Sequence, residues 1–247
     1  MIPMTKDVFI LLPGYDGNGI ATFSKLNQLL FTRLNCLIIN YPYVDQTNKA
    51  YTLEELISYV HKITQQRKLG RFHLVGFSMG GLIASAYAVK YPQQIRSLIL
   101  ISSSIQPRLS VVYRSLIKSA YHLFKIPLFA RFFSLIYCSS ILSSLVSKSP
   151  LPALKQNSFA KEAYPIFSTL ANVLYTSINA DLTPQIAQST IPKYTILFND
   201  DYSFPATIYS PILKDIGFNI IVNKHGGHAT SQNYWQQVAN TLLRLFE

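Results

Sequence analysis

The sequence predicts an α/β protein built on a doubly wound, mostly parallel sheet. Short apolar runs alternate with helical segments through the N-terminal part of the chain, which is the order that βαβ units produce. These runs are apolar at successive positions, as in strands that are buried on both faces. The chain has 247 residues, of which 49% are hydrophobic and 13% charged. This length and composition predict one large domain with an insertion.

The first predicted strand is residues 8–12, a continuous apolar run that ends at a turn-rich loop of residues 13–19. A helix over residues 21–31 follows, because apolar side chains recur there at helical spacing. Residues 36–40 are the second apolar run and predict the second strand. Ligands of such sheets bind beyond the carboxyl ends of the strands, so the loop after the first strand is a candidate part of a site.

The next helix is predicted from a capping-box spacing, in which Glu55 follows Thr52 by three positions. Residues 72–75 have strand character and predict the third strand. Residues 82–90 have helical character, and Pro92 marks the end of that helix. The alternation of strand and helix therefore continues through the first third of the chain.

The alternation breaks after a fourth predicted strand, residues 95–101. Residues 102–180 are Ser-rich, helical and punctuated by proline, and they predict an inserted cap of several short helices. Strand character returns at residues 194–198 and 219–222, and an amphipathic helix over residues 234–246 closes the chain. We therefore expect a core made of residues 1–101 and 181–247.

A serine lies in the turn between the third strand and its helix. Residues 76–81 read G-F-S-M-G-G, with a glycine two positions before and two positions after Ser78. Chance can produce this pattern in any small-residue turn, but a strand before it and a helix after it favour a nucleophile elbow. Such a turn strains the serine backbone and presents its hydroxyl near free N–H groups at a helix N-terminus. Ser78 is the candidate nucleophile.

A serine hydroxyl is a poor nucleophile at neutral pH and needs a base beside it, usually a histidine oriented by a carboxylate. Asp200 and Asp201 follow the fifth predicted strand, and His225 and His228 follow the sixth. Parallel strands bring these loops to the same edge of the sheet as Ser78. Either aspartate could be the acid and either histidine the base.

The chain resembles the α/β-hydrolases of the serine-esterase type over nearly its whole length. The segments that carry the resemblance are the elbow, residues 191–205 with Ile-Pro before the strand, Gly227-His228 before a C-terminal helix, and Pro13-Gly14-Tyr15. In the family, a proline lies four residues past the acid, as Pro205 lies past Asp201. This register favours Asp201 over Asp200, and the preceding glycine favours His228 over His225.

The resemblance also implies an oxyanion hole made of the backbone N–H groups of Tyr15 and Met79. Pro13 stands where the family commonly has a histidine, but the N–H groups do the work there. The chain departs from the family in the acid loop, which usually contains a glycine where this chain has Phe198-Asn199-Asp200. The first two strands of the full fold are missing as well. We therefore expect an α/β-hydrolase fold with a sheet of about six strands, helices on both faces and a helical cap.

Composition restricts the partners and the compartment. The net charge is +11, which favours an anionic substrate, partner or surface. No Arg/Lys-rich run and no zinc spacing supports nucleic-acid binding, so none is expected. No His, Cys and carboxylate grouping predicts a metal site, and no cofactor is expected. Two cysteines, no signal-peptide core and no stretch long enough to span a membrane favour a cytoplasmic protein.

The predicted cap carries most of the positive charge. Residues 102–180 contain eight basic residues and one acidic residue, a net charge of +7. The basic residues are Arg108, Arg114, Lys118, Lys125, Arg131, Lys148, Lys155 and Lys161, and the acid is Glu162. Arg114, Lys118 and Lys125 recur at helical spacing around an apolar side that includes Leu116 and Leu123. The face is either simply solvated or contacts an anionic lipid surface or an acidic carrier protein.

These features predict a serine hydrolase that cleaves a carboxylic ester of an apolar acyl substrate through an acyl-enzyme. An apolar cap over the site favours an apolar acyl or alkyl group. Length, cap position and triad spacing are similar to the pimeloyl-carrier-protein methyl ester esterases, which implies an acidic acyl carrier protein as partner. The alternatives are an acyl-thioesterase, a lysophospholipase, or a binding module that docks a partner or membrane through its basic cap.

Overall fold

The computed structural model describes residues 7–45, 49–107, 110–126, 128–129, 132 and 159–247. Its centre is a six-stranded sheet of order β2-β1-β3-β4-β5-β6, in which every neighbouring pair is parallel. The strands are β1 (Val8–Leu12), β2 (Asn35–Ile38), β3 (Phe72–Phe77), β4 (Ile95–Ile101), β5 (Lys193–Phe198) and β6 (Asn219–Asn223). The sequence-based prediction of a doubly wound parallel sheet is confirmed.

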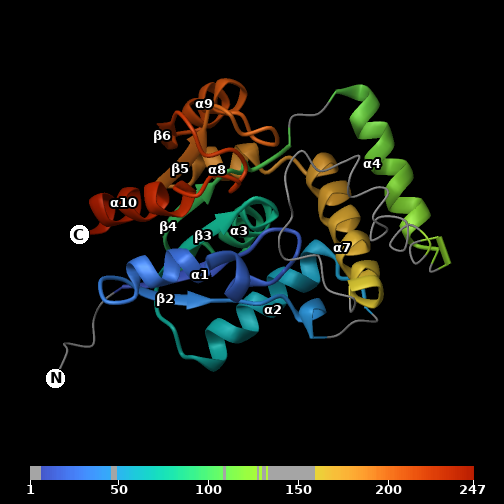
Figure 1. The fold of residues 1–247 in the computed structure, drawn as a ribbon, viewed down its shortest axis with the longest axis horizontal. Coiled ribbons are helices and arrows are strands. Elements are labelled where there is room, and N and C mark those ends of the chain that lie inside the picture. Colours follow the sequence, from blue (N-terminus) through green and yellow to red (C-terminus); the bar gives the residue numbers. More distant parts are fainter. Residues whose placement is uncertain (1–6, 46–48, 108–109, 127, 130–131, 133–158) are drawn as a thin grey trace.

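Helices cover both faces of the sheet (Figure 1). The described helices are α1 (Gly19–Leu30), α2 (Leu53–Gln66), α3 (Met79–Lys90), α4 (Val111–Phe124), α7 (Phe159–Asn179), α8 (Thr183–Gln188), α9 (Ala206–Asp215) and α10 (Tyr234–Phe246). Short 3-10 turns lie at Pro42–Val44 and Pro92–Gln94. Helices α1 and α10 pack on one face, and α2, α3 and α9 on the other. None of the helices in these ranges is long and apolar enough to cross a bilayer.

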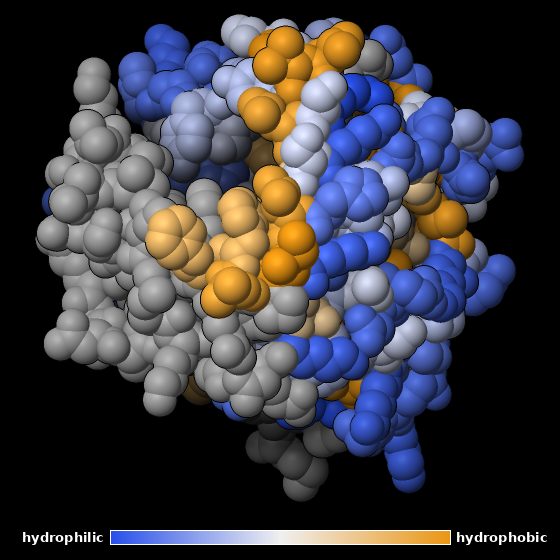
Figure 2. Space-filling model, turned by 90° about the vertical axis from the view of Figure 1, so that its right-hand side faces the viewer, coloured by the Kyte–Doolittle hydropathy of each residue, from blue (hydrophilic) through white to orange (hydrophobic). Residues whose placement is uncertain are grey.

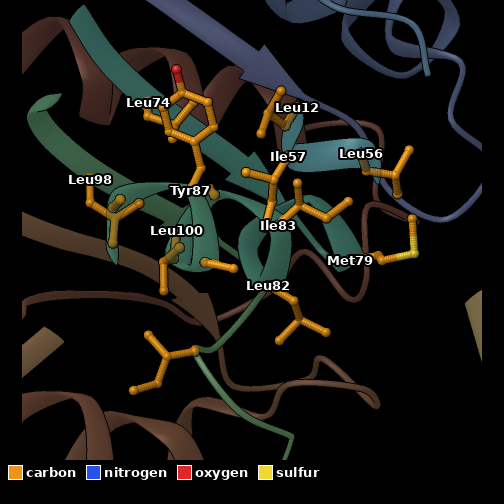
Figure 3. Close-up of a cluster of buried hydrophobic side chains, with 14 of the residues drawn as sticks. Leu12, Leu56, Ile57, Leu74, Met79, Leu82, Ile83, Tyr87, Leu98 and Leu100 are labelled. Atoms are coloured by element: carbon orange, nitrogen blue, oxygen red, sulfur yellow. The ribbon is translucent and has the colours of Figure 1, made fainter. Parts of the chain in front are cut away.

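The continuous apolar runs are explained by burial on both sides of the sheet. Ile10 and Leu12 of β1 face the cluster shared with α2 and α3, whereas Phe9 and Leu11 face the cluster shared with α1 and α10. Figure 3 shows the first cluster, where leucines of neighbouring strands meet Ile83 of α3. A strand with an apolar layer on each face cannot alternate, so its pattern is a solid run.

Most predicted elements are present, with shifted bounds. The capping box is formed, because Thr52 Oγ1 accepts from Glu55 N at 3.2 Å and Glu55 Oε2 accepts from Thr52 N at 2.9 Å. Strand β3 extends to Phe77 and α3 begins at Met79, so the elbow is a single-residue turn. Helix α9 was not predicted, and Pro211 inside it explains why its pattern does not read as helical.

Helices α4 and α7 lie together to one side of the sheet (Figure 1). The Tyr121 ring stacks on Tyr175 with centroids 3.8 Å apart. Helix α7 is joined to the core at Tyr51, whose N–H donates to Thr169 Oγ1 at 2.9 Å and whose carbonyl accepts from Asn172 at 3.0 Å. At 21 residues, α7 is longer than the short helices expected.

The side of α4 that was expected to be buried is exposed. We expected Leu116 and Leu123 beneath the helix, but they are 57% and 41% exposed. Apolar residues surround much of α4, so one contact with α7 cannot bury them all. Several basic residues expected in the cap, namely Arg108, Arg131, Lys148 and Lys155, lie outside the described residues. The boundaries of the cap, 102–180, stay a prediction.

Candidate active site

Ser78 occupies a strained turn between β3 and α3. Its φ of 52° and ψ of −123° lie in a region that non-glycine residues rarely adopt. A side chain at Gly76 would strike the backbone of Gly80 and Gly81, and one at Gly80 would strike the carbonyls that end β1. Strand, helix and the first loop approach so closely that only glycine fits at both positions. This is the physical reason for the spacing found in the sequence.

The elbow is fixed by backbone and side-chain hydrogen bonds. Ser78 N–H donates to the carbonyl of Ile101 at 3.1 Å. Ser103 Oγ donates to the carbonyl of Ser78 at 2.6 Å. Ser103 follows β4, 25 positions along the chain, and its pairing with the elbow has no local sequence signal.

Three side chains from the carboxyl ends of three strands form one hydrogen-bonded line. His228 Nε2 lies 2.9 Å from Ser78 Oγ. His228 Nδ1 lies 3.0 and 3.1 Å from the two carboxylate oxygens of Asp201. Because a carboxylate only accepts, Nδ1 carries the hydrogen and Nε2 is left to accept from the serine hydroxyl. Ser78 is 8% exposed and Asp201 is 1% exposed.

Asp201 is held in its charged form. Burial alone would raise its pKa, but hydrogen bonds from His228, from the N–H of Phe204 and from Ser102 hold the pKa below its ordinary value. Asp201 Oδ1 accepts from the N–H groups of Ser203 and Phe204 at 2.8 and 2.9 Å. These donors fix the carboxylate against His228.

The two residues that compete with this pair lie elsewhere in the same loops. Asp200 accepts from the N–H groups of Gly226 and Gly227 at 3.0 and 2.9 Å, so it anchors the histidine loop. His225 is 85% exposed and its Nδ1 lies 3.7 Å from Asp200. Burial acts to raise the pKa of Asp200, but the two glycine N–H groups lower it overall. The geometry joins Ser78 to His228 and Asp201, and not to His225 or Asp200.

The loop predicted to supply an oxyanion donor lies directly beside Ser78. A side chain built on Gly14 would have its Cβ 3.6 Å from the Cβ of Ser78. The carbonyl of Gly14 accepts from Gly17 N–H at 3.2 Å within the loop. Since peptides are planar and trans, the N–H of Tyr15 points to the opposite side of that peptide. Met79 is the first residue of α3, where the helix supplies no carbonyl partner for its N–H.

Two buried tyrosines hold this loop, and the sequence did not reveal them. Tyr41 OH donates to the carbonyl of Pro13 at 3.1 Å, and Tyr43 OH donates to the carbonyl of Tyr15 at 2.7 Å. Both follow β2 and are almost fully buried. Asp16, next in the loop, has its pKa raised to about 6 by burial. The contacts span 28 residues, so no local pattern announces them.

The predicted binding residues of the cap lie on α4. Figure 1 shows α7 between α4 and the sheet that carries Ser78. Arg114 is half-buried, while Lys118 and Lys125 are exposed. Lys125 Nζ lies 4.2 Å above the Tyr121 ring. These residues are therefore not brought to Ser78. Across the described part of the chain, no group of three or more metal-ligating side chains is gathered.

A strained serine after a strand, with a histidine and a buried aspartate in line, is the constellation of serine hydrolases. A family model described as alpha/beta hydrolase fold matches residues 7–135, just over half of the chain. The chain therefore belongs to the α/β-hydrolase family.

Curated relatives are distant and match only in part. The pimeloyl-[acyl-carrier protein] methyl ester esterase of Wigglesworthia glossinidia brevipalpis is 27% identical over 61% of this chain and 59% of its own length. The human monoacylglycerol lipase ABHD6 is 29% identical over 40% of this chain and 31% of its own length. The chain thus matches less than two thirds of either relative.

Solved structures cover almost the whole chain. An esterase from Exiguobacterium antarcticum superposes with a TM-score of 0.68, covering 97% of this chain and 91% of that one, at 18% identity. At this identity the likeness shows the fold alone.

Proposed function

We propose that this protein is a serine hydrolase that cleaves a carboxylic ester through a Ser78-His228-Asp201 triad. The observation that carries the proposal is the continuous hydrogen-bonded line from Ser78 Oγ through His228 to Asp201 at a strained elbow. A binding module would have no need of a strained serine or of a carboxylate held charged behind a histidine. The complete triad therefore favours the enzyme over the binding module.

In this mechanism, Ser78 Oγ attacks the acyl carbonyl while His228 Nε2 takes the hydroxyl proton. Asp201 holds the imidazole in the required tautomer and stabilises the imidazolium. His228 then gives the proton to the leaving alcohol oxygen, and the acyl group stays on Ser78. A water that loses its proton to His228 attacks the acyl-enzyme, and the carboxylic acid leaves as the serine regains its proton.

The negative charge that develops on the carbonyl oxygen would be held by the N–H groups of Tyr15 and Met79. The position of the 13–15 loop beside Ser78 supports this role for Tyr15, and the helix N-terminus supports it for Met79. A donor of this kind is worth about 2.7–4 kcal/mol of transition-state stabilisation.

The proposed substrate class is an ester with an apolar acyl group, such as the methyl ester of a carrier-bound pimeloyl chain. The relative from Wigglesworthia supports the carrier-bound ester. The human relative supports a lipid ester, so a lysophospholipase is the second candidate. An acyl-thioesterase stays an alternative predicted from the sequence. A panel of short esters, acyl thioesters and lysolipids would separate these substrates by their kcat/KM values.

The nucleophile can be tested without knowing the substrate. A fluorophosphonate probe should label the folded protein at Ser78, as read by mass spectrometry of the labelled peptide, because only an activated serine reacts. Ser78→Ala should not be labelled. Ser97→Ala, which removes a buried serine hydroxyl that bonds His73 and not the elbow, should still be labelled. A folded wild-type protein that resists the probe would sink the proposal.

We also propose that α4 contacts an anionic partner, either an acidic carrier protein or an anionic lipid surface. Lys118 is exposed on α4, and Lys125, the C-cap residue of α4, is exposed as well. Large apolar side chains are exposed beside them, at Val111, Val112, Tyr113, Leu116 and Leu123. Figure 2 views this side of the molecule and shows apolar surface bordered by hydrophilic surface. A helix that exposes apolar and basic residues together has the character of an interfacial helix.

A further inference from the structure

Asp201 also interacts with a second pair of side chains, which does not include His228. Tyr234 of α10 is completely buried, and its OH donates to Ser102 Oγ at 2.7 Å. Ser102 is also completely buried and directly follows β4. The Ser102 side chain lies within reach of the Asp201 carboxylate and helps to hold the pKa of Asp201 below its ordinary value.

The direction of each bond in this line is fixed by chemistry. A charged carboxylate can only accept, so Ser102 gives its single hydroxyl proton to Asp201. The oxygen of Ser102 is then free to accept, and it accepts from Tyr234. Tyr234, Ser102 and His228 therefore all direct their protons, directly or through one hydroxyl, at the same carboxylate.

The backbone of Ser102 is shaped to make this contact. Its φ is 44°, a left-handed conformation that costs free energy for a residue other than glycine. Its N–H donates to the carbonyl of Ile196 at 2.9 Å, which fixes it at the junction of β4 and β5. The side chain is thus held toward the loop that carries Asp201.

We propose that Ser102 and Tyr234 are positioning residues that orient Asp201 and limit its basicity, and so set the pH range in which His228 acts as a base. The proposal rests on the triad proposed above and assigns a role to residues that the triad does not include. Tyr234 acts by polarising the Ser102 hydroxyl, because hydrogen bonds in a chain strengthen one another.

The effect on pH follows from charge. Without the Ser102 donor, negative charge concentrates on the Asp201 oxygens that face His228, and the imidazolium is stabilised. His228 then stays protonated, and inactive as a base, up to a higher pH. The acid limb of the kcat/KM profile should move up by about 0.5–1 pH unit in Ser102→Ala and by about half as much in Tyr234→Phe.

Few other groups could produce such a shift. His228 comes from the loop before α10, and Tyr202, beside Asp201, has its ring 5.5 Å from the His228 ring. Asp200 is turned to the N–H groups of Gly226 and Gly227. His225 faces Asp200 and solvent. In both variants these groups stay unchanged.

The matched control is Ser97→Ala. Ser97 lies on β4, the strand that Ser102 follows, and is as buried as Ser102. Its hydroxyl also hydrogen-bonds a histidine, with Oγ 2.7 Å from His73 Nδ1. It lies toward the opposite end of β4, so its loss should lower stability without moving the pH profile. Ser102→Gly removes the same hydroxyl without the left-handed backbone penalty, and serves if Ser102→Ala does not fold.

The experiment measures the kcat/KM profile for a p-nitrophenyl ester from pH 5 to pH 9 and, separately, the NMR titration of the His228 imidazole without substrate. The proposal expects both midpoints to be lowest, and equal, in wild type and Ser97→Ala. They should be higher in Tyr234→Phe, and highest in Ser102→Ala or Ser102→Gly. Midpoints in the Ser102 variants equal to that of Ser97→Ala would overturn it. If wild type proves inert toward esters and probe, the proposed function fails, while the NMR titration still decides the role of Ser102.

Discussion

Asp200 and Asp201 are neighbouring carboxylates that bind different parts of the histidine loop. Asp201 faces the imidazole of His228, whereas Asp200 faces the N–H groups of Gly226 and Gly227. Asp201 is buried, whereas the Asp200 side chain is 44% exposed. The two side chains therefore have separable effects, one on the base and the other on the loop that carries it.

Asparagine at each position should separate these effects. In Asp201→Asn the side chain can no longer hold His228 in the tautomer that accepts from Ser78, and kcat should fall by about 10³–10⁴-fold. In Asp200→Asn the loop loses a charged acceptor at a partly exposed site. The free energy of unfolding should fall by about 1 kcal/mol, while kcat stays within about tenfold of wild type.

Steady-state kinetics with a p-nitrophenyl ester and urea unfolding would measure both variants. The assignment of the acid would be reversed if Asp200→Asn lost more activity than Asp201→Asn while both remained folded.

At the scale of elements, the segment after β2 holds the loop after β1 in place through hydrogen bonds. Tyr41 and Tyr43 bind the carbonyls of Pro13 and Tyr15, which flank the Gly14–Tyr15 peptide. That peptide carries the N–H proposed to hold the oxyanion. The hydroxyl groups restrain its orientation before the substrate arrives, which is the preorganisation that electrostatic stabilisation requires.

Tyr43→Phe should therefore lower kcat by about tenfold and leave KM nearly unchanged, because the oxyanion forms only in the transition state. Tyr87→Phe is the control, since Tyr87 is equally buried but hydrogen-bonds Gln94, in the turn that follows the C-terminal end of α3. Steady-state kinetics of the two variants would measure the difference. An unchanged kcat in Tyr43→Phe would show that the hydroxyl does not restrain the loop.

The sequence predicted those elements that are determined by residues close together in the chain. The solid apolar run of β1, the capping box at Thr52 and the glycines around Ser78 each follow from neighbours in the chain. The contacts of Tyr41 with Pro13 and of Tyr234 with Ser102 join segments that only the fold brings together. Their partners could not be read from spacing. The prediction of which face of α4 is buried was wrong for a related reason. Apolar residues lie on several sides of this helix, so its sequence does not determine the buried face.

At the scale of the whole molecule, acidic residues are missing from a long central part of the chain. No Asp or Glu occurs between Glu55 and Glu162, while basic residues recur through this interval. The proposed acid and its neighbour belong to the C-terminal part of the core. The residues proposed for chemistry lie in the core and those proposed for partner binding lie at α4, so each set can be changed without the other.

Charge reversal on α4 should expose that separation. Lys118→Glu with Lys125→Glu should weaken binding to vesicles that contain phosphatidylserine, or to an acidic carrier protein, by about tenfold or more. Lys62→Glu with Lys214→Glu changes the net charge equally on α2 and α9, and should alter binding far less. Hydrolysis of a small ester should be the same in both variants. Vesicle sedimentation and titration with a carrier protein would identify the partner, and equal loss in the two variants would show that only net charge matters.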